Sequence, residues 1–496
     1  MRDFTKNLLI SFWCLFPWQV MAQDYAGFAP LVNPSTIRQH VEVLASDSLE
    51  GRGTADPGMQ KAIRYVENQF KSFGLQAPFG SSYTQEVPFV KWNTSAYALT
   101  MGKHVFESGK DFYLSPPFSS QHIFTGGRAF VLMSVDTMTI PPNNVKNGFA
   151  ILLTSHLKDL DNDSLNKLIN QKLKIVSESK PAAVFVERNL NGERERRQIN
   201  RMQYGMLSLL SQVKSDNIPV CHISTETYRV IKKNFKKEKD GSPGLKHTQE
   251  PLQLKIHGHT VTCSNVGAVL KGTDKSDEYI VLTAHLDHLG KKDSLIYYGA
   301  DDDGSGCAAV MNIAAAFSEA ARQGVKSRRN ILFLLFTGEE KGLLGSTYFT
   351  ENPSMPMEKT VANLNIDMIG RSDTVARKNN QYVYLIGSDK MSTDLHRLSE
   401  QTNDTCCNLE LDYTYNDAAH PMRLYYRSDH YSFVKKGVPA IFYFTGLHAD
   451  YHQPTDTADK LDYEKTATIG RLIFSTAWEL ANRNERITID PAPPSK

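Results

Sequence analysis

The sequence lacks the features that mark nucleic-acid binders, repeat proteins and membrane-spanning proteins. Its 56 lysines and arginines are balanced by 54 acidic residues, which leaves a net charge of +2, whereas nucleic-acid-binding domains are usually strongly basic. The two basic runs, Arg194–Arg201 and Lys232–Lys239, are interpreted as solvated faces of helices or loops. Beyond the first residues no apolar run reaches the ~20 residues that a bilayer requires. We therefore expect no nucleic-acid partner and no transmembrane segment in the mature chain.

Cysteine is also scarce, with six residues in the chain. Cys14 lies in the N-terminal apolar segment, so an odd number remains after it. No C-x-x-C pair indicates a structural zinc or redox centre. The adjacent Cys406 and Cys407 are not expected to bridge each other, because the geometry is strained. The cysteines thus exclude a disulfide scaffold.

The N-terminus has the pattern of a secretory signal peptide. Arg2 and Lys6 precede the apolar segment Leu8–Trp18, and Val20-Met21-Ala22 forms a small-residue cleavage site before Gln23. The apolar segment is too short to span a bilayer. We predict cleavage near Ala22-Gln23 and export, either to a periplasm or out of the cell.

The length and the apolar runs predict two α/β domains, one inserted in the other. With 496 residues and 41% hydrophobic content, the chain is long enough for two cores. Helices are predicted at Ser35–Ala45, which a serine could cap, and at Gly58–Phe73. The predicted boundaries are a signal peptide at 1–22, a catalytic domain at 23–90 and 258–484, an inserted domain at 91–257 and a C-terminal tail at 485–496.

The strand predictions follow from short apolar runs. In the inserted region these runs are Ala129–Met133, Ala150–Leu153 and Ala182–Val186. In the C-terminal half they are Tyr279–Ala284, Ile331–Phe336, Val361–Ile366, Tyr382–Ile386 and Val438–Phe444. Runs this apolar suit strands that are covered on both faces. The predicted fold class is therefore α/β, with a mixed, mostly parallel central sheet flanked by helices and a smaller inserted α/β domain.

Five short segments place histidines and carboxylates in or beside turns: Thr283–Gly290, Gly299–Gly306, Phe336–Glu340, Asn365–Gly370 and Tyr451–Asp459. Several of them directly follow a predicted strand. Ligands of open α/β sheets bind beyond the carboxyl ends of the strands. We therefore expect these side chains to meet at one rim of the sheet.

The first two segments supply candidate metal ligands. Asp287 lies two residues after His285, so its carboxylate could hold the second imidazole nitrogen of a ligating histidine. The neighbouring His288 is expected to point away from that face. Asp301-Asp302-Asp303 fits no EF-hand pattern, and one of its carboxylates could bridge two metals.

The pair Glu339-Glu340 ends the buried run Ile331–Phe336, where uncompensated carboxylates would cost several kcal/mol. A metal removes that cost for one carboxylate, and the other can act as a general base. With Asp367 and His452, the chain offers two histidines and three or more carboxylates. This thiolate-free set suits zinc best, with cobalt or manganese as alternatives, and two ions sharing it would hydrolyse a carbonyl substrate. The hydrolase motifs H-E-x-x-H and G-x-S-x-G are missing.

These five segments, in this order and spacing, resemble the co-catalytic di-zinc exopeptidases, which include secreted bacterial aminopeptidases and glutamate carboxypeptidases. The resemblance covers Ser35–Pro88 and Ser264–Asn482. The inserted region is similar to a protease-associated (PA) domain at Lys180–Val186 and Ile218–Ser224, although the charged stretch Glu187–Asp216 matches it poorly.

The resemblance implies a role for each residue. It assigns His285 and Asp367 to one zinc, Glu340 and His452 to the other, and Asp302 to a position between two Zn²⁺ ions. It further implies that Glu339 is the general base and that Asp287 supports His285. The segment Arg427-Ser428-Asp429-His430 looks like the family's pocket-lining element, so Asp429 and His430 are expected to bind substrate. Tyr425, or its neighbour Tyr426, would stabilise the oxyanion.

The expected activity is that of an exported aminopeptidase acting on peptides. The alternatives are a carboxypeptidase or dipeptidase with the same metal centre, a glutaminyl-cyclase-like enzyme with one zinc, and a non-catalytic receptor-like relative. Because every ligand position and the base are filled, the sequence favours hydrolysis.

Overall fold

The computed structural model describes residues 27–92, 97–115, 121–136, 148–157, 159–203, 205–213, 218–236, 245–373, 379–417 and 420–491, with only the backbone at 121–129, 201 and 203. The predicted signal peptide at 1–22 lies outside these residues. Within the described ranges, no helix has both the length and the apolar character needed to cross a membrane.

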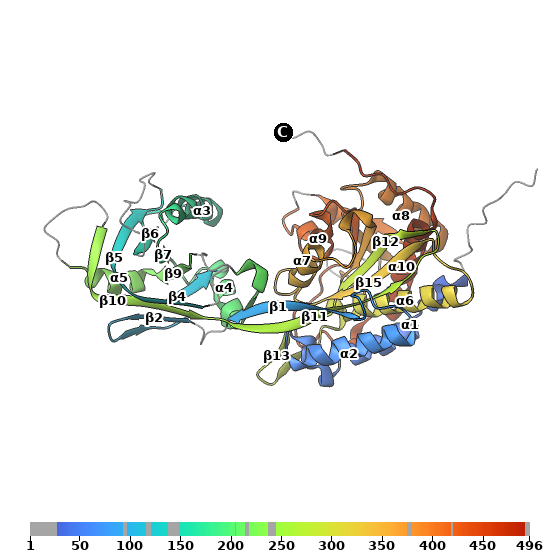
Figure 1. Ribbon diagram of the computed structural model, residues 1–496, viewed down its shortest axis with the longest axis horizontal. Coiled ribbons are helices and arrows are strands. Elements are labelled where there is room, and N and C mark those ends of the chain that lie inside the picture. The colour runs from blue at the N-terminus through green and yellow to red at the C-terminus, as the bar shows by residue number, and fades with distance from the viewer. Residues whose placement is uncertain are drawn as a thin grey trace, which may run out of the picture.

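Two large sheets lie in separate lobes that long strands connect (Figure 1). From one edge to the other, the strands of the first sheet are β18 (Glu410–Asp412), β17 (Tyr382–Ile386), β19 (Ala440–Phe444), β16 (Thr360–Ile366), β12 (Lys275–His285), β15 (Arg329–Phe336), β11 (His259–Leu270), β1 (Thr84–Trp92) and β8 (Met206–Leu209). A short hairpin, β13 (Gly290–Lys292) and β14 (Leu295–Tyr297), stands apart from it.

Parallel pairing joins the central strands β15, β12, β16 and β19, and antiparallel pairs extend the sheet on both sides. Strands β15, β16 and β19 are buried along their whole length, which explains why they read as continuous apolar runs. The predicted α/β class with a mixed sheet is confirmed, and the five strand predictions in this region correspond to β12, β15, β16, β17 and β19.

Helices cover both faces of this sheet. One face packs against α1 (Pro34–Leu44), α2 (Pro57–Ser72), α6 (Gly306–Arg322) and α10 (Tyr463–Asn482), with α8 (Thr393–Cys406) beside α10. The opposite face carries α7 (Leu344–Glu351) and α9 (His430–Val434), where Phe336, Phe349 and Phe433 form an aromatic cluster. The N-terminal cap of α1 is Asn33, which accepts a hydrogen bond from the Thr36 N–H; the predicted serine cap was wrong.

The second sheet has the strand order β3 (His104–Phe106), β2 (Tyr97–Met101), β10 (Leu245–His257), β5 (Gln121–Ser134), β6 (Phe149–Leu153), β7 (Ala183–Arg188), β9 (Val220–Ser224) and β4 (Phe112–Ser115). Its helices are α3 (Asn162–Glu178), α4 (Glu193–Gln203) and α5 (Thr225–Lys233). Strand β8 comes from the same stretch of sequence but pairs with β1 of the first sheet. The segment at 91–257 therefore contributes to both sheets.

Two further contacts concern the chain end and the cysteines. Of the predicted tail at 485–496, Ile487 is buried and the Thr488 N–H donates to Asp394 of α8, so this part packs on the lobe that contains the first sheet. Cys406 and Cys407 are joined by a disulfide, contrary to our expectation.

Candidate metal centre

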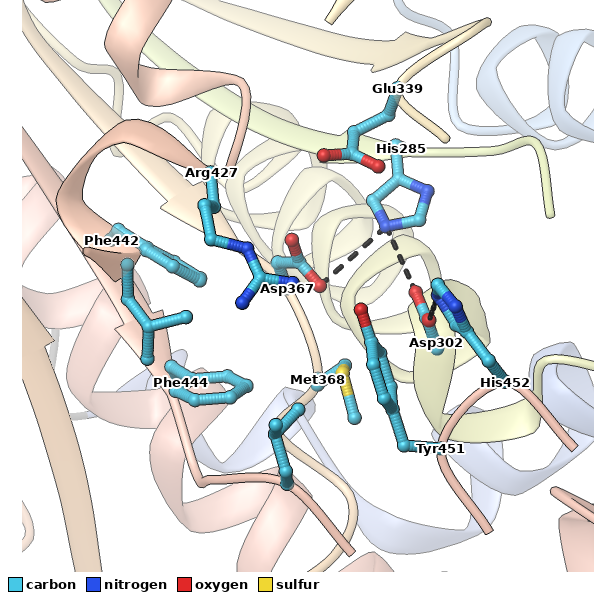
Figure 2. Close-up of a pocket in the computed structure, with 12 residues that line it drawn as sticks. His285, Asp302, Glu339, Asp367, Met368, Arg427, Phe442, Phe444, Tyr451 and His452 are labelled. Atoms are coloured by element: carbon cyan, nitrogen blue, oxygen red, sulfur yellow. Dashed lines mark ion pairs between the residues drawn. The ribbon is translucent and has the colours of Figure 1, made fainter. Parts of the chain in front are cut away.

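The candidate site lies where the parallel strands of the first sheet end. His285 is the last residue of β12 and pairs in register with Phe336, the last residue of β15. Asp367 directly follows β16, and His452 lies in the loop beyond β19. Because parallel strands end at a common edge, these side chains gather there with Asp302 around one pocket (Figure 2).

The first group of side chains surrounds His285. Its Nε2 atom lies 3.2 Å from Oδ1 of Asp302 and 3.5 Å from Oδ1 of Asp367. The three side chains are buried, and one donor atom from each lies within 4.8 Å of the others. These three residues therefore have the spacing of ligands to a single ion.

The second group surrounds Glu340. The Nε2 atom of His452 lies 3.1 Å from Oδ2 of Asp302 and 3.3 Å from Oε2 of Glu340. His288 belongs to this group as well, because its Nδ1 atom lies 2.9 Å from Oε1 of Glu340. The prediction that His288 points away from the site was wrong. The chain does not continue as a straight strand after β12, so the alternation of side chains no longer holds there.

Among the three consecutive aspartates, only Asp302 reaches the histidines of both groups. The carboxylate of Asp303 instead accepts backbone N–H bonds from His285, Gly306 and Met368. The carboxylate of Asp301 accepts the N–H of Gly370 at 2.6 Å. These two aspartates fasten the surrounding loops, and they leave the central one free to face the pocket.

Asp287 supports His285 in a way that differs from the prediction. The Nδ1 atom of His285 lies 2.9 Å from the backbone carbonyl oxygen of Asp287, and the Asp287 carboxylate is not its partner. That carboxylate accepts hydrogen bonds from the Thr54 hydroxyl at 2.6 Å and from the Glu339 N–H at 3.1 Å. The turn after β12 brings the carbonyl, rather than the side chain, to the imidazole. Asp287 therefore connects three segments of the site.

Glu339 lines the pocket beside His285 and Asp367 (Figure 2). Burial raises the pKa of its carboxyl well above the usual value; His285 opposes the shift, while Glu340 and Asp367 add to it. So many acids in one buried site repel one another, and a bound cation is the natural counter-charge.

The donor atoms fit divalent cations. Oδ2 of Asp302, Oε1 of Glu340 and both ring nitrogens of His288 are buried and make no hydrogen bond of good geometry with the described part of the chain. Each such buried polar atom left unsatisfied costs about 1–3 kcal/mol. Nitrogen and oxygen donors without thiolate are what zinc accepts in mixed sites.

The pocket walls are apolar on one side and polar on the other. The described residues that line it, besides the metal-type side chains and Glu339, are Met368, Leu424, Arg427, Phe442, Phe444, Leu447 and Tyr451. Figure 2 shows the Tyr451 hydroxyl pointing toward His285 and Asp302. Sequence reasoning missed Tyr451, although its position next to His452 was a usable signal.

The three residues expected to bind substrate lie behind the wall. Asp429 and His430 are fully buried, and the His430 ring stacks on Phe442 at 5.0 Å. Burial lowers the pKa of His430 to about 3, so this ring is neutral. Tyr425 packs 5.7 Å from the His430 ring and does not line the pocket. His430 opens α9, which turns these side chains toward the interior; within the expected pocket element it is Arg427 that reaches the cavity.

Arg52 holds the loops that carry the site. It is fully buried, and its guanidinium donates to four backbone carbonyls, those of Leu44, Leu286, Tyr298 and Gly299, at 2.6–2.8 Å. Leu286 directly follows His285, and Gly299 lies three residues before Asp302. A single side chain thus ties the loop after β12 to the loop before Asp302.

Substitution of Arg52 should therefore destabilise the lobe that contains the first sheet. We expect Arg52→Lys to lower the thermal unfolding midpoint by roughly 5–10 °C, because an ammonium cannot satisfy four carbonyls arranged around a planar fork. Circular dichroism during heating measures the change. The matched control is Arg38→Lys at an exposed position of α1, which should shift the midpoint by no more than about 2 °C. Equal midpoints for the two variants would show that Arg52 does not hold these loops.

Comparisons with known proteins agree with this site. Residues 265–477 match the family described as Peptidase family M28, and the match spans both ligand groups. A probable leucine aminopeptidase of Trichophyton verrucosum (strain HKI 0517) is 30% identical over 223 residues, which are 44% of this chain and 57% of that protein. The chain thus spans little more than half the length of this curated relative.

Solved structures share the fold over nearly the whole chain. An aminopeptidase from Aneurinibacillus sp. strain AM-1 has a TM-score of 0.55 at 18% identity, with 95% of this chain and 98% of that chain covered. BSAP, a zinc aminopeptidase from Bacillus subtilis, has a TM-score of 0.53 at 16% identity, with 91% and 96% covered. Residues 265–477 of this chain are thus similar to peptidase family M28, and the solved aminopeptidases share its fold.

Proposed function

We propose that this protein is a zinc-dependent exopeptidase that binds two zinc ions and removes N-terminal residues from peptides. The observation that carries the proposal is the orientation of Asp302, whose Oδ1 faces His285 and whose Oδ2 faces His452. A carboxylate in this orientation could serve two metals that share a site. His285 and Asp367 would hold one zinc, and Glu340 and His452 the other.

His288 is a second histidine near Glu340, and we assign it a supporting role. It is fully buried, and it does not line the pocket, whereas His452 does. Its Nδ1 atom lies 2.9 Å from Oε1 of Glu340, and this contact would limit the directions that the carboxylate can take.

Zinc in this site would polarise the substrate carbonyl and make a water molecule more acidic. Glu339 lies at the pocket surface, belongs to neither ligand group, and is held through its own N–H by Asp287. In the proposed reaction Glu339 accepts the proton of the attacking water and returns it to the leaving amine. Tyr451, whose hydroxyl points toward the two groups, would donate a hydrogen bond to the oxygen that becomes negative.

The pocket favours the amino end of a peptide with an apolar first residue. Phe442, Phe444 and Leu447 offer an apolar wall, and the acidic cluster beside it would attract an α-ammonium group. The name of the Trichophyton verrucosum relative agrees with this preference. Arg427 supports the alternative, since a cation that lines the pocket could pair with a terminal carboxylate, as a carboxypeptidase requires.

Two matched peptides separate these activities. An aminopeptidase will cleave Leu-Ala-Phe-amide, whose carboxyl end is blocked, and will leave N-acetyl-Leu-Ala-Phe intact; a carboxypeptidase will do the reverse. The chelator 1,10-phenanthroline should abolish cleavage, added zinc should restore it, and the non-chelating 1,7-phenanthroline should have no effect. Cleavage that survives the chelator would contradict the metal assignment. A zinc content near two per chain also separates this proposal from a one-zinc cyclase and from a non-catalytic relative.

A series of buried hydrogen bonds predicts that Ser428 also affects the zinc affinity. The Ser428 hydroxyl donates to Oδ2 of Asp367 at 2.7 Å and accepts from the Asn365 amide at 2.8 Å. We expect Ser428→Ala to weaken zinc binding about 10–100-fold, because partners that orient a metal ligand commonly contribute this much. Competition with a chromophoric chelator measures the affinity.

The control for this variant is Ser432→Ala. Ser432 is equally buried, and its hydroxyl contacts Ser346 and Thr347 rather than a carboxylate of the site. If both variants lose the same zinc affinity, the effect comes from packing and not from the Asp367 contact.

Export through the signal peptide at 1–22 and a PA-like domain at 91–257 remain part of the proposal. The first is supported only by the sequence pattern. The second is supported by the separate sheet that most of this segment forms.

A further inference from the structure

The second lobe contains a cavity that the proposed peptidase site does not use. Its volume is about 530 Å³, within the range of small-molecule sites. Helices α3 and α4 and strands β4, β7 and β9 supply most of the described residues that line it: Tyr113, Ser115, Asn166, Ile169, Asn170, Leu173, Arg188, Arg194, Gln198, Ile218, Val220 and His222.

The sheet and α3 create this cavity together. Alternate residues of β9 (Val220 and His222) and of β4 (Tyr113 and Ser115) line it, as side chains on one face of a sheet do. The core beneath α3 is filled over β5, β6 and β7. The cavity therefore lies on the same face of the sheet, nearer the β4 edge, where the side chains of α3 no longer fill the space above the strands.

Buried polar groups on its wall are only partly satisfied. Arg188 is 7% exposed; its Nη1 lies 3.3 Å from Glu195 and its Nη2 donates to Oδ1 of Asn166 at 2.6 Å. Within the described residues its Nε has no hydrogen-bond partner, and neither do the amide nitrogen of Asn166 and the Nδ1 atom of His222. Two of these three atoms are donors only, and both belong to residues that line the cavity.

The charge of the wall is positive. Arg188 and Arg194 both line the cavity, and Glu195 is the one carboxylate within ion-pair distance of them among the described residues. Burial, together with these two arginines, lowers the pKa of His222 to about 3, so the imidazole stays neutral. A carboxylate would complement this charge and could pair with a guanidinium of the wall.

The remaining wall is apolar and aromatic. Ile169, Leu173 and Ile218 line it, and the Tyr113 ring stacks on His222 at 4.5 Å. We infer that this cavity is a binding site for a small carboxylate that carries an apolar side chain, either a free amino acid or the C-terminal residue of a peptide. The inference does not rest on the proposed peptidase activity.

Isothermal titration calorimetry on the full mature chain tests the inference with N-acetyl-L-leucine. This probe has the carboxylate and the apolar side chain, and its blocked amine keeps it from imitating an aminopeptidase substrate. N-acetyl-L-leucinamide, which lacks the carboxylate, should bind at least about tenfold more weakly, because a hydrogen bond to a charged group contributes at least that much. N-acetyl-glycylglycyl-L-leucine tests the peptide source, and tighter binding of this compound would identify a peptide C-terminus as the ligand.

Two variants and one control locate the binding. Arg194→Gln removes an exposed charge at the cavity and should weaken the binding of N-acetyl-L-leucine about tenfold. The control is Lys167→Gln, at an exposed position of α3 that does not line the cavity, and it should leave the affinity unchanged. Leu173→Trp fills the cavity and should abolish the binding while peptidase turnover stays the same. An absence of binding heat, equal affinity for the amide, or full affinity in Leu173→Trp would each overturn the inference.

Discussion

Glu339→Gln should lower kcat by about 1,000-fold while the protein keeps its full zinc content. The amide has nearly the same shape as the carboxylate but cannot accept a proton, and general-base catalysis typically contributes 10²–10⁴-fold. The Glu339 carboxylate belongs to neither group of candidate ligands, and the main-chain N–H that donates to Asp287 is unchanged by the substitution. Steady-state kinetics and metal analysis on the same preparation measure both quantities.

The neighbouring variant Glu340→Gln is the matched control. Its carboxylate lies 3.3 Å from His452 and 2.9 Å from His288, so its loss should reduce the zinc content as well as the rate. The two variants therefore separate a base from a ligand at adjacent positions. A Glu339→Gln enzyme with near-normal kcat, or one that has lost zinc, would show that the roles are assigned incorrectly.

Asp302→Asn should have the largest effect on metal binding of any single substitution. An asparagine has one oxygen and presents N–H donors on the other side, so it cannot face a cation on both sides as the two Asp302 oxygens would. We expect the zinc content to fall below one per chain and turnover to fall by more than about 1,000-fold, since both ions act in the proposed reaction. Atomic absorption after gel filtration gives the stoichiometry.

Asp301→Asn provides the comparison for this variant. The Asp301 carboxylate accepts the Gly370 N–H and lies 3.2 Å from His448, and it does not reach the histidines of either ligand group. An asparagine can keep the first of these contacts, so this variant should retain nearly two zinc ions. Equal zinc loss in Asp301→Asn and Asp302→Asn would mean that the whole acidic turn, rather than the central carboxylate, holds the metals.

The arrangement also explains why the loops of the site need so many fixed contacts. The carboxylates of Asp287 and Asp303 accept backbone or hydroxyl hydrogen bonds, and Arg52 binds four carbonyls. Buried acids that repel one another would otherwise push these loops apart. Fixed loops keep the ligands in position before any metal binds, as tight and selective sites require.

The sequence by itself was sufficient to predict the strands and the edge of the sheet at which the site residues lie. Strands β15, β16 and β19 are buried on both faces, so each appears as an uninterrupted apolar run, and the residues directly after such a run must lie at the carboxyl edge of the sheet. His285, Asp367 and the pair Glu339-Glu340 could therefore be placed together from their positions alone. The charge balance and the missing motifs likewise excluded other classes of protein without any knowledge of the fold.

Only the tertiary structure decided which atoms face each other. The turn after β12 presents the Asp287 carbonyl to His285 and turns His288 inward, and the backbone after Gly299 aims Asp302 rather than its neighbours at the pocket. Turn geometry rotates each side chain independently of any sequence period, so spacing could not predict these directions. The pairing of β8 with β1 and the cavity beside Arg188 depend on contacts between segments far apart in the sequence, and such contacts leave no local pattern.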